Sequence, residues 1–151
     1  METLLDYVLK IVFAGVGTFC FAIIFCVPKK HHLSAALTGA VGWAVYIIML
    51  HFNQGVVIST LVATLALTLL SKIFSLTQKA PMTIFLFCGI FPLVPGAGIY
   101  YTAYYFMQGD MFLFAKKGIE TLKIAIALSI GISAVTALQF PKRRTHNTNT
   151  N

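Results

Sequence analysis

Long apolar stretches with few charges constrain this sequence more than any other feature. Five stretches cover 4–27, 33–50, 56–76, 80–107 and 118–140. A helix needs about 20 residues to cross about 30 Å of hydrocarbon, and each stretch has roughly that length. Only 10% of the residues are charged, too few for the surface of a water-soluble domain. We therefore expect one all-α domain over 1–140, a polytopic membrane protein with about five transmembrane helices.

Membrane-spanning strands are the alternative fold. The segment 124–131 does alternate locally between larger and smaller side chains. Five short strands cannot close a barrel, however, and an open sheet edge in lipid leaves backbone groups without partners. The length of the stretches and their lack of turn residues favour helices.

Charged residues divide between the two ends of the predicted helices. With five crossings, one side carries Lys29, Lys30, Lys72, Lys79, Lys142, Arg143 and Arg144, and the other carries all four acids, Glu2, Asp6, Asp110 and Glu120. The positive-inside rule then places the N-terminus outside the cell membrane and the polar tail, 141–151, in the cytoplasm. No basic stripe with interleaved aromatic residues is present, so we expect the lipid bilayer as a partner and no nucleic acid.

Small residues recur at helical spacing in three stretches. They are Ala14, Gly15, Gly17, Thr18 and Ala22 in the first, Ala35, Ala36, Gly39, Ala40 and Ala44 in the second, and Ala125, Ser129, Ser133 and Ala137 in the last. Such faces let helix backbones approach closely within lipid. Packing within the chain is one interpretation; docking of a partner subunit or of a second copy is the other.

The fourth stretch contains two prolines and two glycines within seven residues, Pro92, Pro95, Gly96 and Gly98. Each proline removes a backbone donor, and the glycines permit angles that a helix does not use. We predict that the helix is broken near Pro92–Gly98; a simple kink is the alternative. Non-helical backbone at that depth must be buried in protein or line water.

A break there has a chemical use. The second half-helix starts near Gly96, and its free N–H groups attract carboxylates. Discontinuous helices form substrate sites in many transporters. The candidate substrate-binding residues are Pro92, Pro95, Gly96, Gly98, Tyr101, Thr102 and Tyr104. The tyrosines also suit an aromatic belt at the membrane interface. Gly109 and Asp110 are candidates for gating, or for capping the segment that follows.

Other groups carry less information. We expect Lys116, Glu120 and Lys123, which share a helix face, to form an interfacial network of charge pairs. No metalloprotease helix motif, nucleophile elbow, phosphate-binding loop or suitable carboxylate pair occurs in the sequence. We therefore expect no enzyme, and no metal or cofactor.

Several motifs together resemble a known family. They are Val27-Pro28-Lys29-Lys30, Gly39-Ala40-Val41-Gly42-Trp43, Pro92-Leu93-Val94-Pro95-Gly96, Tyr101-Thr102 and Gly109-Asp110. The chain resembles the shorter, C-terminal half of the threonine/serine exporter family, up to about Leu138. The proline-rich motif with the two pairs that follow it is the most specific part of the resemblance.

The resemblance implies an exporter made of two unlike helical halves, fused in some members and separate in others. It implies a small carboxylate-bearing substrate: threonine, serine, or a dicarboxylate such as succinate. A longer helical membrane subunit would then be the partner. Two other hypotheses stay open: a non-transporting assembly or stabilising subunit, and a small-solute channel.

Overall fold

The computed structural model describes residues 4–137, which form helices joined by short connections and contain no β-strand. The elements are α1 (Leu4–Ile24), the 3-10 turn η1 (Lys29–His31), α2 (His32–His51), α3 (Val56–Gln78), α4 (Met82–Ile90), the 3-10 turn η2 (Phe91–Leu93), α5 (Gly96–Met107) and α6 (Met111–Ala137). Four helices, α1, α2, α3 and α6, are long and apolar enough to cross a membrane, and α4 and α5 are a bent pair that forms a fifth span if counted as one. The prediction of an all-α membrane protein with a broken fourth helix is confirmed.

The last helix begins earlier than predicted, at Met111 rather than at 118. Lys116 and Lys117 precede the predicted start, but a lysine at a helix end can extend its charge toward water and stay helical. The first three helices end within three residues of their predicted bounds. Residues 138–140 of the predicted last helix and the tail 141–151 lie outside the described residues.

Close contacts at glycines hold the bundle together. A Cβ added at any of four glycines would lie within 2.8 Å of a side chain on a neighbouring helix. The pairs are Gly39 with Thr18 (α2 on α1), Gly42 with Leu67 (α2 on α3), Gly89 with Thr38 (α4 on α2) and Gly131 with Thr64 (α6 on α3). Because lipid is as apolar as these side chains, this close packing stabilises the bundle.

The predicted small-residue faces divide between two uses. Ala35 and Gly39 are buried against other helices, as expected for packing within the chain. On α6, by contrast, Ser129, Ser133 and Ala137 are exposed, and a different face packs inward. That part of α6 therefore remains available to lipid or to another chain.

A stripe of hydroxyl side chains runs along the buried face of α3. Thr60, Thr64, Thr68 and Ser71 are at most 2% exposed. Each hydroxyl donates to the carbonyl four residues earlier, at 2.6–2.9 Å. The hydroxyls are thus satisfied within their own helix, as a buried polar group requires.

Hydrogen bonds tie the start of α2 to the end of α3. The ring Nδ1 of His31, a residue only 4% exposed, is hydrogen-bonded to Gln78 Oε1, and Gln78 Nε2 donates to Ser34 Oγ. The His31 ring also meets Phe85 of α4 edge-on, with the ring centroids 5.6 Å apart. The start of α2, the end of α3 and helix α4 are therefore joined at this end of the bundle.

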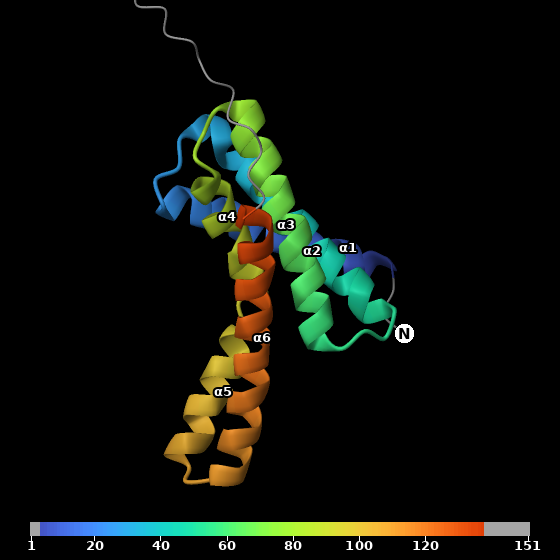
Figure 1. Ribbon diagram of the computed structural model, residues 1–151, viewed down its shortest axis with the longest axis vertical. Coiled ribbons are helices and arrows are strands. Elements are labelled where there is room, and N and C mark those ends of the chain that lie inside the picture. Colours follow the sequence, from blue (N-terminus) through green and yellow to red (C-terminus); the bar gives the residue numbers. More distant parts are fainter. Residues whose placement is uncertain (1–3, 138–151) are drawn as a thin grey trace, which may run out of the picture.

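The hairpin of α5 and α6 stands apart from the other helices. Figure 1 shows α5 beside the first half of α6, both extending away from α1–α4, while the second half of α6 lies against α3. No residue of α5 is buried. One end of the broken span therefore depends on α6 alone for support.

Candidate functional site: the broken span

The break in the fourth span lies at Val94 and Pro95. Pro95 has φ −76° and ψ 59°, and Gly96 N–H donates to Val94 O at 2.7 Å. These are the angles and the bond of an inverse γ-turn. The axes on either side differ by 53°. Pro92 lies within η2, so the first proline tightens the end of α4 and the second separates the two half-helices.

The N-terminus of α5 faces open space. Its first helical bond is Ile99 N–H to Pro95 O, at 3.0 Å, and no side chain caps this end. A Cβ added at Gly96 would meet nothing within 4 Å. The partial positive charge of a helix N-terminus is therefore accessible beside Gly96.

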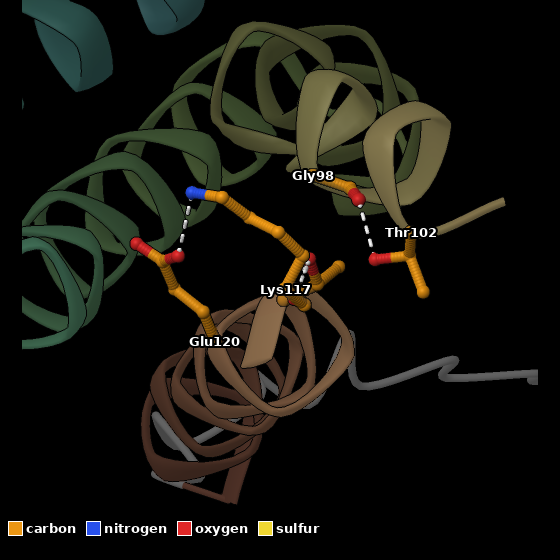
Figure 2. A network of polar contacts seen from close by, with 5 residues as sticks. Gly98, Thr102, Lys117 and Glu120 are labelled. Atoms are coloured by element: carbon orange, nitrogen blue, oxygen red, sulfur yellow. Dashed lines mark hydrogen bonds and ion pairs between the residues drawn. The ribbon is translucent and has the colours of Figure 1, made fainter. Parts of the chain in front are cut away.

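Gly98 and Thr102 face α6 instead. A Cβ at Gly98 would lie 2.4 Å from Thr121 Oγ1, and a Cβ at Gly118 would lie 3.4 Å from Thr102 Cγ2. The Thr102 hydroxyl donates to Gly98 O at 2.7 Å, as Figure 2 shows. Both residues pack the hairpin in this structure, so their contact with a ligand stays a prediction.

The tyrosines of α5 are largely exposed. Tyr100 and Tyr104 stack with ring centroids 6.4 Å apart, and so do Tyr101 and Tyr105. The Tyr104 hydroxyl accepts a hydrogen bond from Gln108 Nε2 at 2.9 Å. Neither Tyr101 nor Tyr104 lines the groove described next, so the predicted site residues do not form one cluster.

A groove of about 810 Å³ runs between α5 and α6 beside the break. Of the predicted residues, Pro95 and Thr102 line it. Its α6 wall includes Thr121 and Ser129, whose hydroxyls donate to carbonyls of their own helix at 2.8 and 3.0 Å. The walls are therefore mainly apolar. Sequence reasoning missed the α6 wall, although the four-residue spacing of Ala125 and Ser129 marked it as a small-residue face.

Pro92 lies elsewhere. It lines a separate crevice of about 310 Å³ with Lys10, Phe13, Ala14 and Trp43, between η2 and helices α1 and α2. The two prolines of the motif thus face different parts of the molecule.

Gly109 and Asp110 form the turn that starts α6. Gly109 has φ +77°, which favours glycine, and Asp110 Oδ1 accepts a hydrogen bond from Leu113 N–H at 3.0 Å. This is the geometry of a helix N-cap. A short distance along α6, Glu120 pairs with Lys117 at 3.0 Å, and not with Lys116 as the spacing suggested (Figure 2). Both side chains are substantially exposed.

Apolar helices joined at glycine contacts, with one span broken into half-helices, define a multi-pass helical membrane protein. Among residues 4–137, no group of three or more His, Cys, Asp or Glu side chains could hold a metal ion.

Comparison with known proteins identifies the family. Residues 10–138 match the family model described as Threonine/Serine exporter, ThrE. The chain belongs to the threonine/serine exporter family. An uncharacterized protein of Haemophilus influenzae is 29% identical over 97 residues, which are 64% of this chain and 33% of that protein. The chain thus matches about a third of that relative's length. No solved structure matches it.

Proposed function

We propose that this chain is one subunit of a two-component secondary exporter of small carboxylate-bearing metabolites. The substrates would be threonine, serine, or dicarboxylates such as succinate. The partner would be a longer helical membrane subunit of the same family. The pair would lie in the cell membrane, with the N-terminus of this chain outside and its C-terminus in the cytoplasm.

The broken span carries this proposal. Met82–Leu93 and Gly96–Met107 each contain 12 residues, or about 18 Å of helix at 1.5 Å per residue. Two halves of equal length support a break near the middle of a membrane about 30 Å thick. An uncapped helix N-terminus at that depth favours a carboxylate, because low-dielectric surroundings screen its partial positive charge poorly.

The groove alone supplies little else for substrate recognition. Its three hydroxyl groups, on Thr102, Thr121 and Ser129, already donate to backbone carbonyls. Because Gly96 N–H and Ile99 N–H already donate to Val94 O and Pro95 O, the backbone N–H groups of Ala97 and Gly98 are the donors that remain for a carboxylate in the first turn of α5. We infer that the partner subunit supplies the remaining polar contacts.

Two observations support an incomplete unit. Helix α5 packs against α6 and has no buried residue, although non-helical backbone beside it would be costly to expose to lipid. The Haemophilus influenzae relative is also much longer than the segment that this chain matches. A second polypeptide that covers the break would complete the site.

Export by membrane vesicles tests the proposal. Vesicles carrying this chain and the longer subunit, identified by its adjacent reading frame, are loaded with labelled threonine, serine or succinate. We expect saturable efflux that needs both chains. Gly96→Leu should abolish it, because the leucine would fill the open space at the helix N-terminus. The matched control is Gly55→Leu in the α2–α3 connection, where a Cβ also meets nothing within 4 Å.

The apolar walls of the groove favour one alternative, a stabilising subunit that only docks a helix of its partner. Efflux by the longer subunit alone would support that role and contradict ours. Normal efflux from Gly96→Leu would refute the assigned position of the substrate. Flux without saturation or coupling would indicate a channel.

A further inference from the structure

Three exposed lysines gather at the end of the bundle where α1 meets α2 and α3 meets α4. Lys29 and Lys30 belong to η1, and Lys79 follows α3 with a left-handed φ of 50°. The sequence contains no Asp or Glu between Asp6 and Asp110. This end of the bundle therefore carries positive charge with no acid nearby along the chain.

The two lysine-bearing connections are held together. The hydrogen bonds that link His31, Gln78 and Ser34 join the residue after Lys30 to the residue before Lys79. Because His31 is buried, these bonds are shielded from water. The three charges are thus kept at one place instead of on independent loops.

Two helix N-termini add to the positive potential there. Helix α2 begins at His32 and α4 begins at Met82, and neither has a side-chain cap. Each presents the positive end of its dipole next to the lysines. An anionic group is the natural counterpart of this arrangement.

An apolar crevice of about 240 Å³ begins beside the same connections. Phe25 and Val27 line it just before the Lys29–Lys30 pair, and Thr83, Ile84, Phe87 and Cys88 line it in the first turns of α4. Phe25 and Phe87 are 49% and 59% exposed, on the outside of the bundle. A ligand that fits here has an anionic head and an apolar tail.

We propose that this surface binds an anionic phospholipid. The phosphate lies among Lys29, Lys30 and Lys79, and an acyl chain lies in the crevice between the end of α1 and the start of α4. A free phosphate ion would satisfy the lysines but not the crevice. The site is independent of the broken span and of the proposed transport role.

Lipid counting by native mass spectrometry tests the site. The purified full-length chain in detergent is titrated with phosphatidylglycerol or with phosphatidylcholine of the same acyl chains. We expect selective retention of phosphatidylglycerol. Each lysine near an anionic surface strengthens binding about fivefold, so Lys29→Gln with Lys30→Gln should weaken it roughly 25-fold. The matched control is Lys116→Gln with Lys123→Gln, which removes the same charge from exposed positions on α6.

The unmodified protein gives further readouts. Selectivity for phosphatidylglycerol should fall as salt approaches 1 M, where the screening length is about 3 Å. A six-carbon phosphatidylglycerol should bind more weakly than the long-chain lipid, and millimolar inorganic phosphate should compete poorly. Equal retention of both lipids, equal loss in the control variant, or selectivity unchanged by salt would each overturn the proposal.

Discussion

Gly98→Ala should loosen the α5–α6 hairpin without unfolding the rest of the chain. The added Cβ would lie 2.4 Å from Thr121 Oγ1, about 1 Å closer than ordinary contact allows. Thr121 cannot rotate away freely, since it is β-branched and its hydroxyl donates to Lys117 O at 2.8 Å. Overpacking of this kind costs about 1–3 kcal/mol. Replacing a glycine in a helix by alanine also stabilises that helix, by up to about 1 kcal/mol.

The two ranges leave a net loss centred on about 1–2 kcal/mol, and this loss weakens the packing of α5 on α6. Because α5 packs on α6 rather than on the core, we expect local opening, seen as faster hydrogen exchange from Ile99 to Met107. The calculated change is roughly 5- to 30-fold in the exchange rate. Amides of α2 and α3 should exchange at their original rates.

Two further variants make this prediction specific. Gly96→Ala, where the new Cβ meets nothing within 4 Å, should leave exchange in α5 nearly unchanged. Adding Thr121→Ala to Gly98→Ala should restore protection, with a coupling energy of about 0.5–3 kcal/mol. The reasoning would be refuted by equal exchange in Gly96→Ala and Gly98→Ala, or by the absence of rescue.

Three more substitutions test the fold. Gly39→Ala should destabilise the bundle by about 1–3 kcal/mol, because its Cβ would lie 1.9 Å from Thr18 Oγ1. Gly17→Ala should not, because a Cβ there meets nothing within 4 Å. Thermal unfolding followed by the fluorescence of the single tryptophan, Trp43, checks both variants. Asp110→Ala should cost about 1 kcal/mol and speed exchange in the first turn of α6, and Asp110→Asn should retain most protection. His31→Ala should cost about 1–3 kcal/mol by leaving Gln78 underpaired, whereas exposed His51→Ala should change the melting temperature little.

The membrane fold could be predicted because the bilayer imposes one length on every span. The break could also be predicted, since Pro95 cannot donate to the helix ladder and its neighbour Gly96 tolerates the turn. The start of α6 was missed because the last apolar stretch was counted only from Gly118, after Lys116 and Lys117. The informative signal was Asp110, whose side chain caps α6. The helix begins at Met111, seven residues before the predicted start at 118.

The face that each residue presents could not be predicted in the same way. Gly98 and Thr102 lie four residues apart, and this spacing suits a ligand site and a helix contact equally. Only the position of α6 decides between them. Likewise, Glu120 has lysines on either side at helical spacing, and its pairing with Lys117 follows from side-chain direction. The four-residue repeat of Thr60, Thr64 and Thr68 in α3 does not by itself tell whether that face is buried.

The back-bonded stripe of α3 also bears on how the chain reaches its membrane. Thr60, Thr64 and Thr68 carry their hydrogen bonds within the helix, so these three hydroxyls need no further partner when α3 leaves the insertion machinery. Its later association with α6 then combines the close packing of Gly131 on Thr64 with one hydrogen bond, from Lys72 Nζ to Val135 O at 3.0 Å. Biogenesis can therefore proceed helix by helix, and the fit between surfaces together with a few hydrogen bonds between helices selects the final arrangement.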